Sequence, residues 1–366
     1  MKKSIAIYLC ICLLLTGCAN IFDGHYVSIT PHEEPNNAVD TQAVSAANYD
    51  DLCAALQTMT NSGSTSGLIS VAQYPQYAVE GDMKRAVTQT MAQDPVSAYA
   101  VESIEFELGS SAGQSAIAVQ IAYVHDRTEI QKIRNVSDMD DAKNRIALEL
   151  NKLSTGVVLY TENYEQLDLT QWVEDYAALY PESVMETPQT TVNLYPETGE
   201  KRIIELKFTY QNSRDALRTM QTQVNPMFAS AELYVSGNGG TREKYAQLYA
   251  FLMERFENYT LETSITPAYS LLIHGVGDAK AFATVYSAMC RQAGLTCMSV
   301  AGTRNGVAWY WNIICDGNVY YHVDLIQCNE NGAFRGRTDE QMSGYVWDYS
   351  AYPVCGVPIA EEQNNP

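Results

Sequence analysis

Basic residues are scarce in this sequence of 366 residues. Lysine and arginine number 23 against 43 aspartates and glutamates, which gives a formal net charge of -20. Proteins that bind nucleic acids or anionic lipid headgroups usually present clustered positive charge. The deficit therefore argues against a basic patch for either partner, and we expect no nucleic acid to bind. A hydrophobic fraction of 46% is ordinary for a globular chain, and the length allows two or three domains.

Histidine is also scarce, and the cysteines are not spaced as metal ligands. The chain has five histidines and nine cysteines, yet it contains neither a CxxC nor an HxxxH pattern. Such short spacings are typical of zinc sites. His25 and His32 lie in a polar stretch and are expected to be solvated. The sequence thus indicates no metal and no cofactor.

Long apolar runs are missing after the N-terminal segment, so no later stretch reaches the roughly 18 residues of a membrane-spanning helix. Residues 1–17 look like a lipoprotein signal peptide, because Lys2 and Lys3 precede an apolar run. The tetrapeptide that ends at Cys18 is similar to a bacterial lipobox, whose cysteine carries a lipid such as palmitate. We therefore expect an extracytoplasmic protein that Cys18 anchors to the bacterial membrane. An ordinary signal peptide or a short buried helix is the alternative.

Residues 18–48 are predicted to be a flexible tether, because prolines and polar residues are scattered there without a sustained period. Between residues 49 and 228 we predict two degenerate α/β repeat units, offset by roughly 86 to 90 residues. Nothing in these units resembles a catalytic site, and such units usually serve as spacers or binding platforms. Each unit contains a strand with alternating apolar residues: Ile117, Val119, Ile121 and Tyr123 in the first, and Ile204, Leu206, Phe208 and Tyr210 in the second.

One helix and three strands are predicted in the stretch that follows Gly275. Asp278 is a suitable N-cap, and apolar residues recur at helical spacing from Phe282 until Gly294 ends the pattern. Strands are predicted at 296–302, 307–315 and 319–326. An Asp-Gly-Asn sequence joins the last two strands as a hairpin.

This stretch resembles the core of the bacterial transglutaminase-like superfamily, which has a papain-like cysteine protease fold. In that family the helix begins Cys, Glu, Gly, Tyr, Ala, the second strand reads His, Ala, Trp, Asn, and the third strand carries Asp. Counting back from Gly294 places the family's Cys on Ala279. The strand motifs place its His on Trp309 and its Asp on Asp324. The resemblance implies an α+β fold in which tandem α/β units precede a transglutaminase-like domain at 229–366, where a helix packs on an antiparallel sheet.

The aligned triad lacks its nucleophile and its base. The chemistry needs a thiolate at a helix N-terminus and an imidazole to relay the proton. Ala279 and Trp309 supply neither, and no histidine lies between Gly275 and Tyr321. Loss of the nucleophile alone costs about 10^6 in rate in well-studied triads. We therefore predict a pseudoenzyme in which Asp324 persists as a structural hydrogen-bond acceptor.

A binding role is one function that this prediction leaves open. The partner would be a cell-wall peptide, a glycan or an envelope protein. Aromatic side chains with polar tips suit sugars and extended peptides. Four such residues are candidates for an aromatic groove, although Trp309 can instead simply fill the space of the missing side chains: Trp309, Tyr310, Trp311 and Trp347.

Two further functions remain alternatives. The first is a cysteine-dependent hydrolase or acyl transferase that uses a non-standard nucleophile, Cys290 or Cys297, with His322 and Asp324. The second is a purely structural envelope protein. Export also permits disulfides; we expect Cys328 to pair with Cys355, with an all-thiol state as the alternative.

Overall fold

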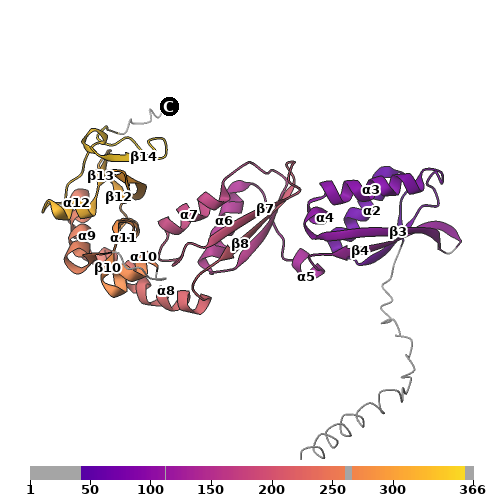
Figure 1. The fold of residues 1–366 in the computed structure, drawn as a ribbon, viewed down its shortest axis with the longest axis horizontal. Helices are drawn as coiled ribbons and strands as arrows, with labels where there is room; N and C mark the ends of the chain where they lie inside the picture. Colours follow the sequence, from indigo (N-terminus) through magenta and orange to yellow (C-terminus); the bar gives the residue numbers. More distant parts are fainter. Residues whose placement is uncertain (1–42, 112, 260–265, 359–366) are drawn as a thin grey trace, which may run out of the picture.

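The structure is a computed structural model that describes residues 43–111, 113–259 and 266–358. Three bodies follow one another along the molecule: an indigo unit, a magenta unit and an orange-to-yellow terminal domain (Figure 1). Each body has its own apolar core. Within the described ranges, no helix is both long enough and apolar enough to cross a bilayer. The predicted signal peptide, the lipid anchor and most of the predicted tether (residues 18–48) lie outside these ranges, and the end of that tether contains the short strand β1 (Val44–Ser45).

The first unit is a four-stranded sheet in the order β1-β2-β4-β3. The short β1 runs parallel to β2, and the other pairs are antiparallel. Leu52 and Leu56 of α2 pack in the core with Ile69 and Ile117 of the sheet. The elements are β1 (Val44–Ser45), α2 (Tyr49–Ser62), β2 (Ser66–Ser70), α3 (Val79–Gln93), α4 (Pro95–Ala100), β3 (Val101–Ser111), β4 (Gln114–Tyr123) and the short α5 (Arg127–Ile130).

The second unit has the same strand order and the same strand directions, β5-β6-β8-β7 with β5 parallel to β6. The apolar alternation in β8 places Ile204, Leu206 and Phe208 in the core. The first helix of each unit is also capped, since the Asn48 side chain caps α2 and that of Asp138 caps α6. The elements are β5 (Arg134–Val136), α6 (Met139–Asn151), β6 (Gly156–Thr161), α7 (Leu169–Leu179), β7 (Gln189–Tyr195) and β8 (Arg202–Thr209).

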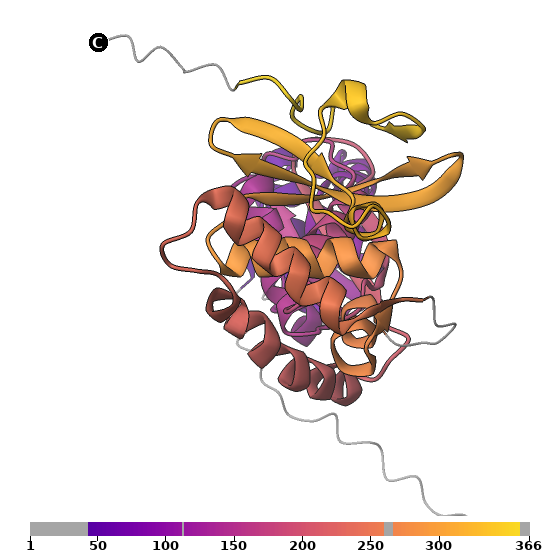
Figure 2. The same ribbon diagram turned by 90° about the vertical axis from the view of Figure 1, so that its left-hand side faces the viewer.

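The terminal domain is built on a sheet in the order β13-β12-β11-β14. Helices cover one face of this sheet and the yellow C-terminal segment covers the other (Figure 2). Its elements are α8 (Arg214–Ala229), the 3-10 helix η1 (Ser230–Tyr234), α9 (Thr241–Arg255), β9 (Glu257–Asn258), α10 (Pro267–Tyr269), the π-helix η2 (Ser270–His274), β10 (Val276–Gly277), α11 (Ala279–Gln292), β11 (Cys297–Arg304), β12 (Val307–Asp316), β13 (Val319–Val323), α12 (Leu325–Glu330), the 3-10 helix η3 (Asp339–Gln341) and β14 (Tyr345–Trp347).

The predicted α+β architecture is confirmed, and one boundary is corrected. The last strand was expected to run to residue 326, but it ends at Val323. Asp324 accepts a hydrogen bond from the backbone N–H of Gln327 at 3.0 Å, so it acts as the N-cap of α12. The apolar residues Leu325 and Ile326 are therefore buried from a helix and not from a strand.

The second unit and the terminal domain are joined by apolar packing and by side-chain hydrogen bonds from α8 and α11. Leu217 and Val224 of α8 are buried in the terminal core, although α8 precedes the boundary predicted at residue 229. Arg291 of α11 forms an ion pair with Glu182 at 2.6 Å and donates to the Leu179 carbonyl. Its guanidinium also lies 4.4 Å from the ring centre of Tyr180. These contacts bring α11 against the loop that follows α7.

Candidate functional site

The site begins at the N-terminus of α11. Asp278 Oδ1 accepts a hydrogen bond from the backbone N–H of Ala281 at 2.9 Å and so fixes the start of the helix. Ala279 is the first helical residue and is only 7% exposed. A thiol at this position would feel the positive end of the helix dipole, which lowers a thiol pKa. A methyl group occupies it instead.

Trp309 lies on β12 and is hydrogen-bonded to Asp324. Its indole Nε1 donates to Asp324 Oδ2 at 2.9 Å, and the carboxylate is 2% exposed. Trp309 also packs against the core that contains Ala279. A hydrogen bond with an indole donor therefore joins the two residues that were predicted as the second and third triad positions.

Asp324 is satisfied by further donors around it. Tyr345 Oη donates to Asp324 Oδ2 at 2.6 Å, and Arg304 Nη1 lies 3.8 Å from the same oxygen. The Arg304 guanidinium covers the Trp309 ring at 5.2 Å. Burial, followed by the hydrogen bond to Asp324, raises the pKa of Tyr345, so its proton stays available for donation. A buried carboxylate held this way is an acceptor that fixes its neighbours in place.

The four aromatic residues predicted to form a groove do not share one. Trp311 is 1% exposed and Trp347 is 7% exposed, and their rings pack edge to face at 5.8 Å. Both belong to the core between the sheet and the C-terminal segment. Trp309 and Tyr310 are half-buried, and neighbouring residues of a strand point to opposite faces. The aromatic groove is thus wrong, because tertiary packing uses two of its members as core.

The alternative nucleophile sites do not assemble either. His322 is fully buried and bonds to Asp339, with Nε2 and Oδ1 2.8 Å apart, and it has no contact with Asp324 among the hydrogen bonds of the described residues. Cys290 is completely buried, and burial raises its thiol pKa well above the usual value. Its contacts are with Cys297 and Tyr286, so neither cysteine meets His322.

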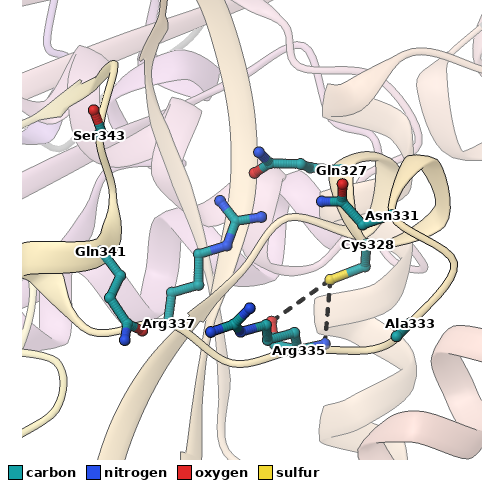
Figure 3. Close-up of a pocket in the computed structure, with 8 residues that line it drawn as sticks. All are labelled: Gln327, Cys328, Asn331, Ala333, Arg335, Arg337, Gln341 and Ser343. Atoms are coloured by element: carbon teal, nitrogen blue, oxygen red, sulfur yellow. Dashed lines mark hydrogen bonds between the residues drawn. The ribbon is translucent and has the colours of Figure 1, made fainter.

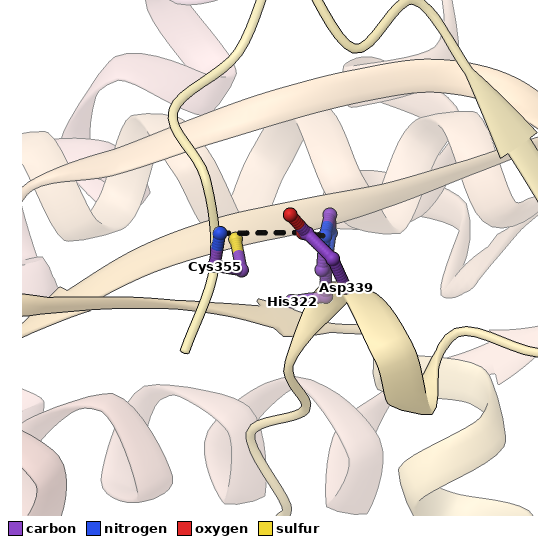
Figure 4. A group of neighbouring side chains, drawn as sticks. All are labelled: His322, Asp339 and Cys355. Atoms are coloured by element: carbon purple, nitrogen blue, oxygen red, sulfur yellow. Dashed lines mark hydrogen bonds and ion pairs between the residues drawn. The ribbon is translucent and has the colours of Figure 1, made fainter. Parts of the chain in front are cut away.

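His322, Asp339 and Cys355 form a cluster that sequence reasoning missed (Figure 4). Their potential ligand atoms lie within 4.8 Å of one another. The indole N–H of Trp311 donates to His322 Nδ1 at 2.9 Å, so Nδ1 carries no proton. A neutral ring must then hold its proton on Nε2, where it donates to Asp339. The ring of His322 then has no lone pair left for a metal, and the cluster acts as a polar link between β13 and the C-terminal segment.

No local sequence pattern connects the three residues of this cluster. Asp339 also accepts from the backbone N–H of Cys355 at 3.2 Å. Asp339 and Cys355 lie far along an irregular segment with no periodic pattern. The nearest carboxylate in sequence to His322 is Asp324, and their spacing of two on a predicted strand suggested that they share a face. The structure pairs His322 with Asp339 instead.

All six cysteines in the described part of the chain are free thiols. Cys328 Sγ accepts from the backbone N–H of Arg335 at 3.4 Å, while Cys355 lies beside Asp339. The expected disulfide between Cys328 and Cys355 is therefore not formed. Burial and the nearby Asp339 carboxylate raise the pKa of Cys355 to about 12, so its thiol is a poor nucleophile at neutral pH.

A cleft of about 480 Å³ lies between the second unit and the terminal domain. Lys280 and Thr284 line it from successive turns of α11, and Tyr210 lines it from the end of β8. Lys280 directly follows Ala279 and forms no ion pair within the described residues; its ammonium lies 5.4 Å from the ring centre of Tyr310. The cleft thus opens beside the first triad position.

Two hydroxyl groups in this cleft lack hydrogen-bond partners among the described residues. The Tyr210 hydroxyl is buried and unpaired, and burial raises its pKa to about 12. Thr284 is 6% exposed and its side chain makes no hydrogen bond within the described ranges. Unpaired buried hydroxyls are costly.

Comparison with known proteins identifies the terminal domain. Residues 229–325 match the transglutaminase-like superfamily, so the chain carries a transglutaminase-like domain, as the sequence resemblance implied. No curated protein matches the chain. The lack of catalytic residues and the lipid anchor stay predictions.

Three solved structures are similar to parts of the chain. A candidate protease from Parabacteroides distasonis has 9% identity and a TM-score of 0.24, covering 60% of this chain and 35% of its own. A TGase has 8% identity and a TM-score of 0.25, and the match covers 53% of this chain and 59% of the TGase. A candidate cysteine protease from Cytophaga hutchinsonii has 12% identity and a TM-score of 0.25, and the match covers 46% of this chain and 70% of the protease. The chain spans less than two thirds of the first two structures, and overlaps this weak carry no argument about activity.

Proposed function

We propose that the transglutaminase-like domain is catalytically inactive and binds a peptide-like partner. The hydrogen bond from Trp309 Nε1 to Asp324 Oδ2 carries this proposal. An indole N–H can donate to the aspartate as an imidazole N–H would, but indole is a donor only. It cannot accept the proton of a nucleophile or return it to a leaving group. Asp324 therefore orients a ring that has no acid–base function.

The nucleophile position supports the same conclusion. Ala279 has no group that could form an acyl intermediate. The buried Cys290 cannot replace it, because it lies at the other end of α11 with a raised thiol pKa. The two thiols of the hydrolase alternative, Cys290 and Cys297, are both buried, and no hydrogen bond of the described residues joins either of them to His322.

The cleft beside Ala279 supports a binding role. It combines the Lys280 ammonium and the Thr284 hydroxyl with apolar walls such as Val184 and Met185. A peptide offers carbonyl oxygens to the donors and side chains to the walls. A glycan offers hydroxyls but fewer apolar groups, so we favour a peptide or a protein segment over a sugar.

The catalytic part is tested with a thiol variant. We expect wild-type protein to show no amide hydrolysis or acyl transfer that iodoacetamide inhibits. Ala279→Cys should add one thiol that reacts faster with iodoacetamide at pH 7 than the native thiols, because the helix N-terminus lowers its pKa. Thr284→Cys is the matched control, since it places a thiol in the same cleft away from the helix end. Iodoacetamide-sensitive turnover by the wild type would overturn the proposal.

The binding part is tested with a peptide array and fluorescence anisotropy of the hits. Lys280→Glu should weaken peptide binding about tenfold or more, since it removes the free cation of the cleft. Lys201→Glu makes the same charge change on the exposed surface, where Lys201 pairs with Glu162, and should bind as the wild type does. If no peptide binds, or if both variants behave alike, the structural envelope role replaces the binding role.

The proposed location is the outer side of a bacterial membrane, with Cys18 as the lipidated residue. The lipobox-like tetrapeptide and the preceding apolar segment support it. Cys18→Ser should move the protein from the membrane fraction to the soluble fraction, while Cys53→Ser should leave it in place. Retention of the Cys18→Ser protein at the membrane would refute the anchor.

A further inference from the structure

A second pocket lies on the terminal domain, between α12 and the C-terminal segment (Figure 3). Its volume is about 540 Å³, and none of the residues that line it is acidic. Arg337 extends across it toward Gln327 and Asn331, while Arg335 extends from the C-terminal segment toward Arg337 (Figure 3). The pocket is separate from the cleft beside Ala279, whose lining residues it does not share.

Both arginines are without an acidic partner. Among the described residues, neither Arg335 nor Arg337 forms an ion pair, whereas the nearby Arg304 pairs with Glu330 at 3.1 Å and approaches Asp324. The chain carries 43 acidic residues against 23 basic ones, so carboxylates are abundant. Two neighbouring guanidiniums that face one pocket repel each other in the absence of an anion.

The backbone that carries the arginines is held firmly. The backbone N–H and C=O groups of Arg337 pair with those of His322 at 2.9 Å in both directions. The backbone N–H of Arg335 donates to Cys328 Sγ. Gly336 lies between them, and a Cβ there would come within 2.9 Å of the Tyr321 side chain. Only glycine lets the segment approach β13 this closely, and this packing orders the base of both arginines before any ligand arrives.

Other donors face the same space. Gln341 Oε1 accepts from the backbone N–H of Thr338, which leaves the amide nitrogen of Gln341 free to donate. The side chains of Asn331 and Ser343 line the pocket and make no hydrogen bond within the described residues. The pocket thus offers two guanidinium groups on a held backbone and several neutral donors, and no carboxylate lines it.

We propose that this pocket binds a doubly charged oxyanion group, a phosphoryl group or a pair of carboxylates, between Arg335 and Arg337. The planar guanidinium fork matches both kinds of oxyanion in a bidentate manner. Two guanidiniums balance two negative charges, so a dianion is preferred over a monoanion. The volume exceeds that of the anionic group alone, so the group belongs to a larger ligand.

The test is a titration of the purified full chain with phosphate, succinate and acetate at constant ionic strength, followed by calorimetry and thermal unfolding. We expect saturable binding of phosphate or succinate, with acetate at least tenfold weaker. Comparison of phosphate with succinate distinguishes the two sources of the dianion. Equal, non-saturating effects of all three salts would overturn the proposal.

Variants locate the binding. Arg335→Gln and Arg337→Gln should each weaken dianion binding about tenfold, and Arg335 is exposed, so its replacement should leave the fold intact. Arg242→Gln on the exposed start of α9 is the matched control and should bind as the wild type does. Dianion binding that survives both pocket variants would contradict the assignment. The result is independent of the peptide cleft, since neither arginine lines it.

Discussion

At the scale of single residues, two aromatic side chains hold the buried carboxylate of Asp324. Trp309 donates to Asp324, and Tyr345 donates to the same oxygen. The sequence predicted the positions of Ala279, Trp309 and Asp324 from the order of a few motif residues. It did not predict Tyr345 as a donor, because residues 21 apart in an irregular tail have no spacing that signals a contact.

Replacing Trp309 tests how much its ring contributes. Trp309→Ala removes half-buried aromatic surface and leaves Asp324 without one donor, so we expect a loss of about 2–4 kcal/mol in the free energy of unfolding. Trp309→His keeps a ring N–H and should lose about half as much. Urea denaturation measures both. A Trp309→Ala protein as stable as the wild type would show that the hydrogen bond is incidental.

His322 predicts a loss of stability in mild acid. Burial lowers its pKa below 6.5 against the opposing effect of Asp339, so the folded protein holds the ring neutral. As the pH falls below 6.5, His322 becomes protonated in the unfolded chain but stays neutral in the folded one. The free energy of unfolding then decreases by up to ~1.4 kcal/mol per pH unit. The groups around the ring are Trp311, Asp339 and Arg337.

The control for this effect is His322→Gln, whose amide can accept from Trp311 and donate to Asp339 without titrating. Denaturation curves between pH 5 and 6.5 should show the acid slope in the wild type and a smaller slope in the variant. Identical slopes would assign the acid sensitivity to another group.

At the scale of elements, the helix–strand–strand order of the terminal domain followed from periodicity, caps and turn residues. The end of β13 did not. The run Val323 to Ile326 is apolar enough for a strand, but Asp324 caps a new helix and so ends the strand. A single capping hydrogen bond decides between two patterns that the sequence leaves nearly equal.

Asp324 therefore has two roles that substitutions can separate. Asp324→Asn keeps a capping oxygen and should cost about 1 kcal/mol. Asp324→Ala removes the cap and leaves Trp309 and Tyr345 without their acceptor, so we expect a loss of about 3 kcal/mol or more. Thermal and urea unfolding of the two variants give the comparison. Equal losses would mean that the cap contributes nothing and that the carboxylate matters only as the acceptor of Trp309 and Tyr345.

At the scale of the whole molecule, the repeat of the two α/β units is visible in the sequence, whereas the contact between the second unit and the terminal domain is not. The two α/β units share one strand order, and the offset between matching residues let the sequence predict their elements. The junction with the terminal domain could not be predicted, because it depends on Arg291 reaching Glu182, 109 positions away. Long-range contacts of single side chains leave no local pattern.

Arg291→Ala should loosen this junction. It removes a partly buried ion pair with Glu182 and a contact with the Tyr180 ring, while both partners remain. We expect chymotrypsin to cleave the loop after α7 several-fold faster in the variant than in the wild type. Arg218→Ala, an exposed change on α8, is the control. Unchanged cleavage would show that the core packing of α8 suffices.

The C-terminal segment also covers the edge of β13, and this bears on self-association. β13 is the last strand of its sheet, and single bridges from Pro358, Cys355 and Arg337 occupy its outer edge. A strand edge with free N–H and C=O groups is a template for pairing with another molecule. Chains that end before residue 337 would present that edge uncovered, and they should aggregate where the intact chain stays dispersed.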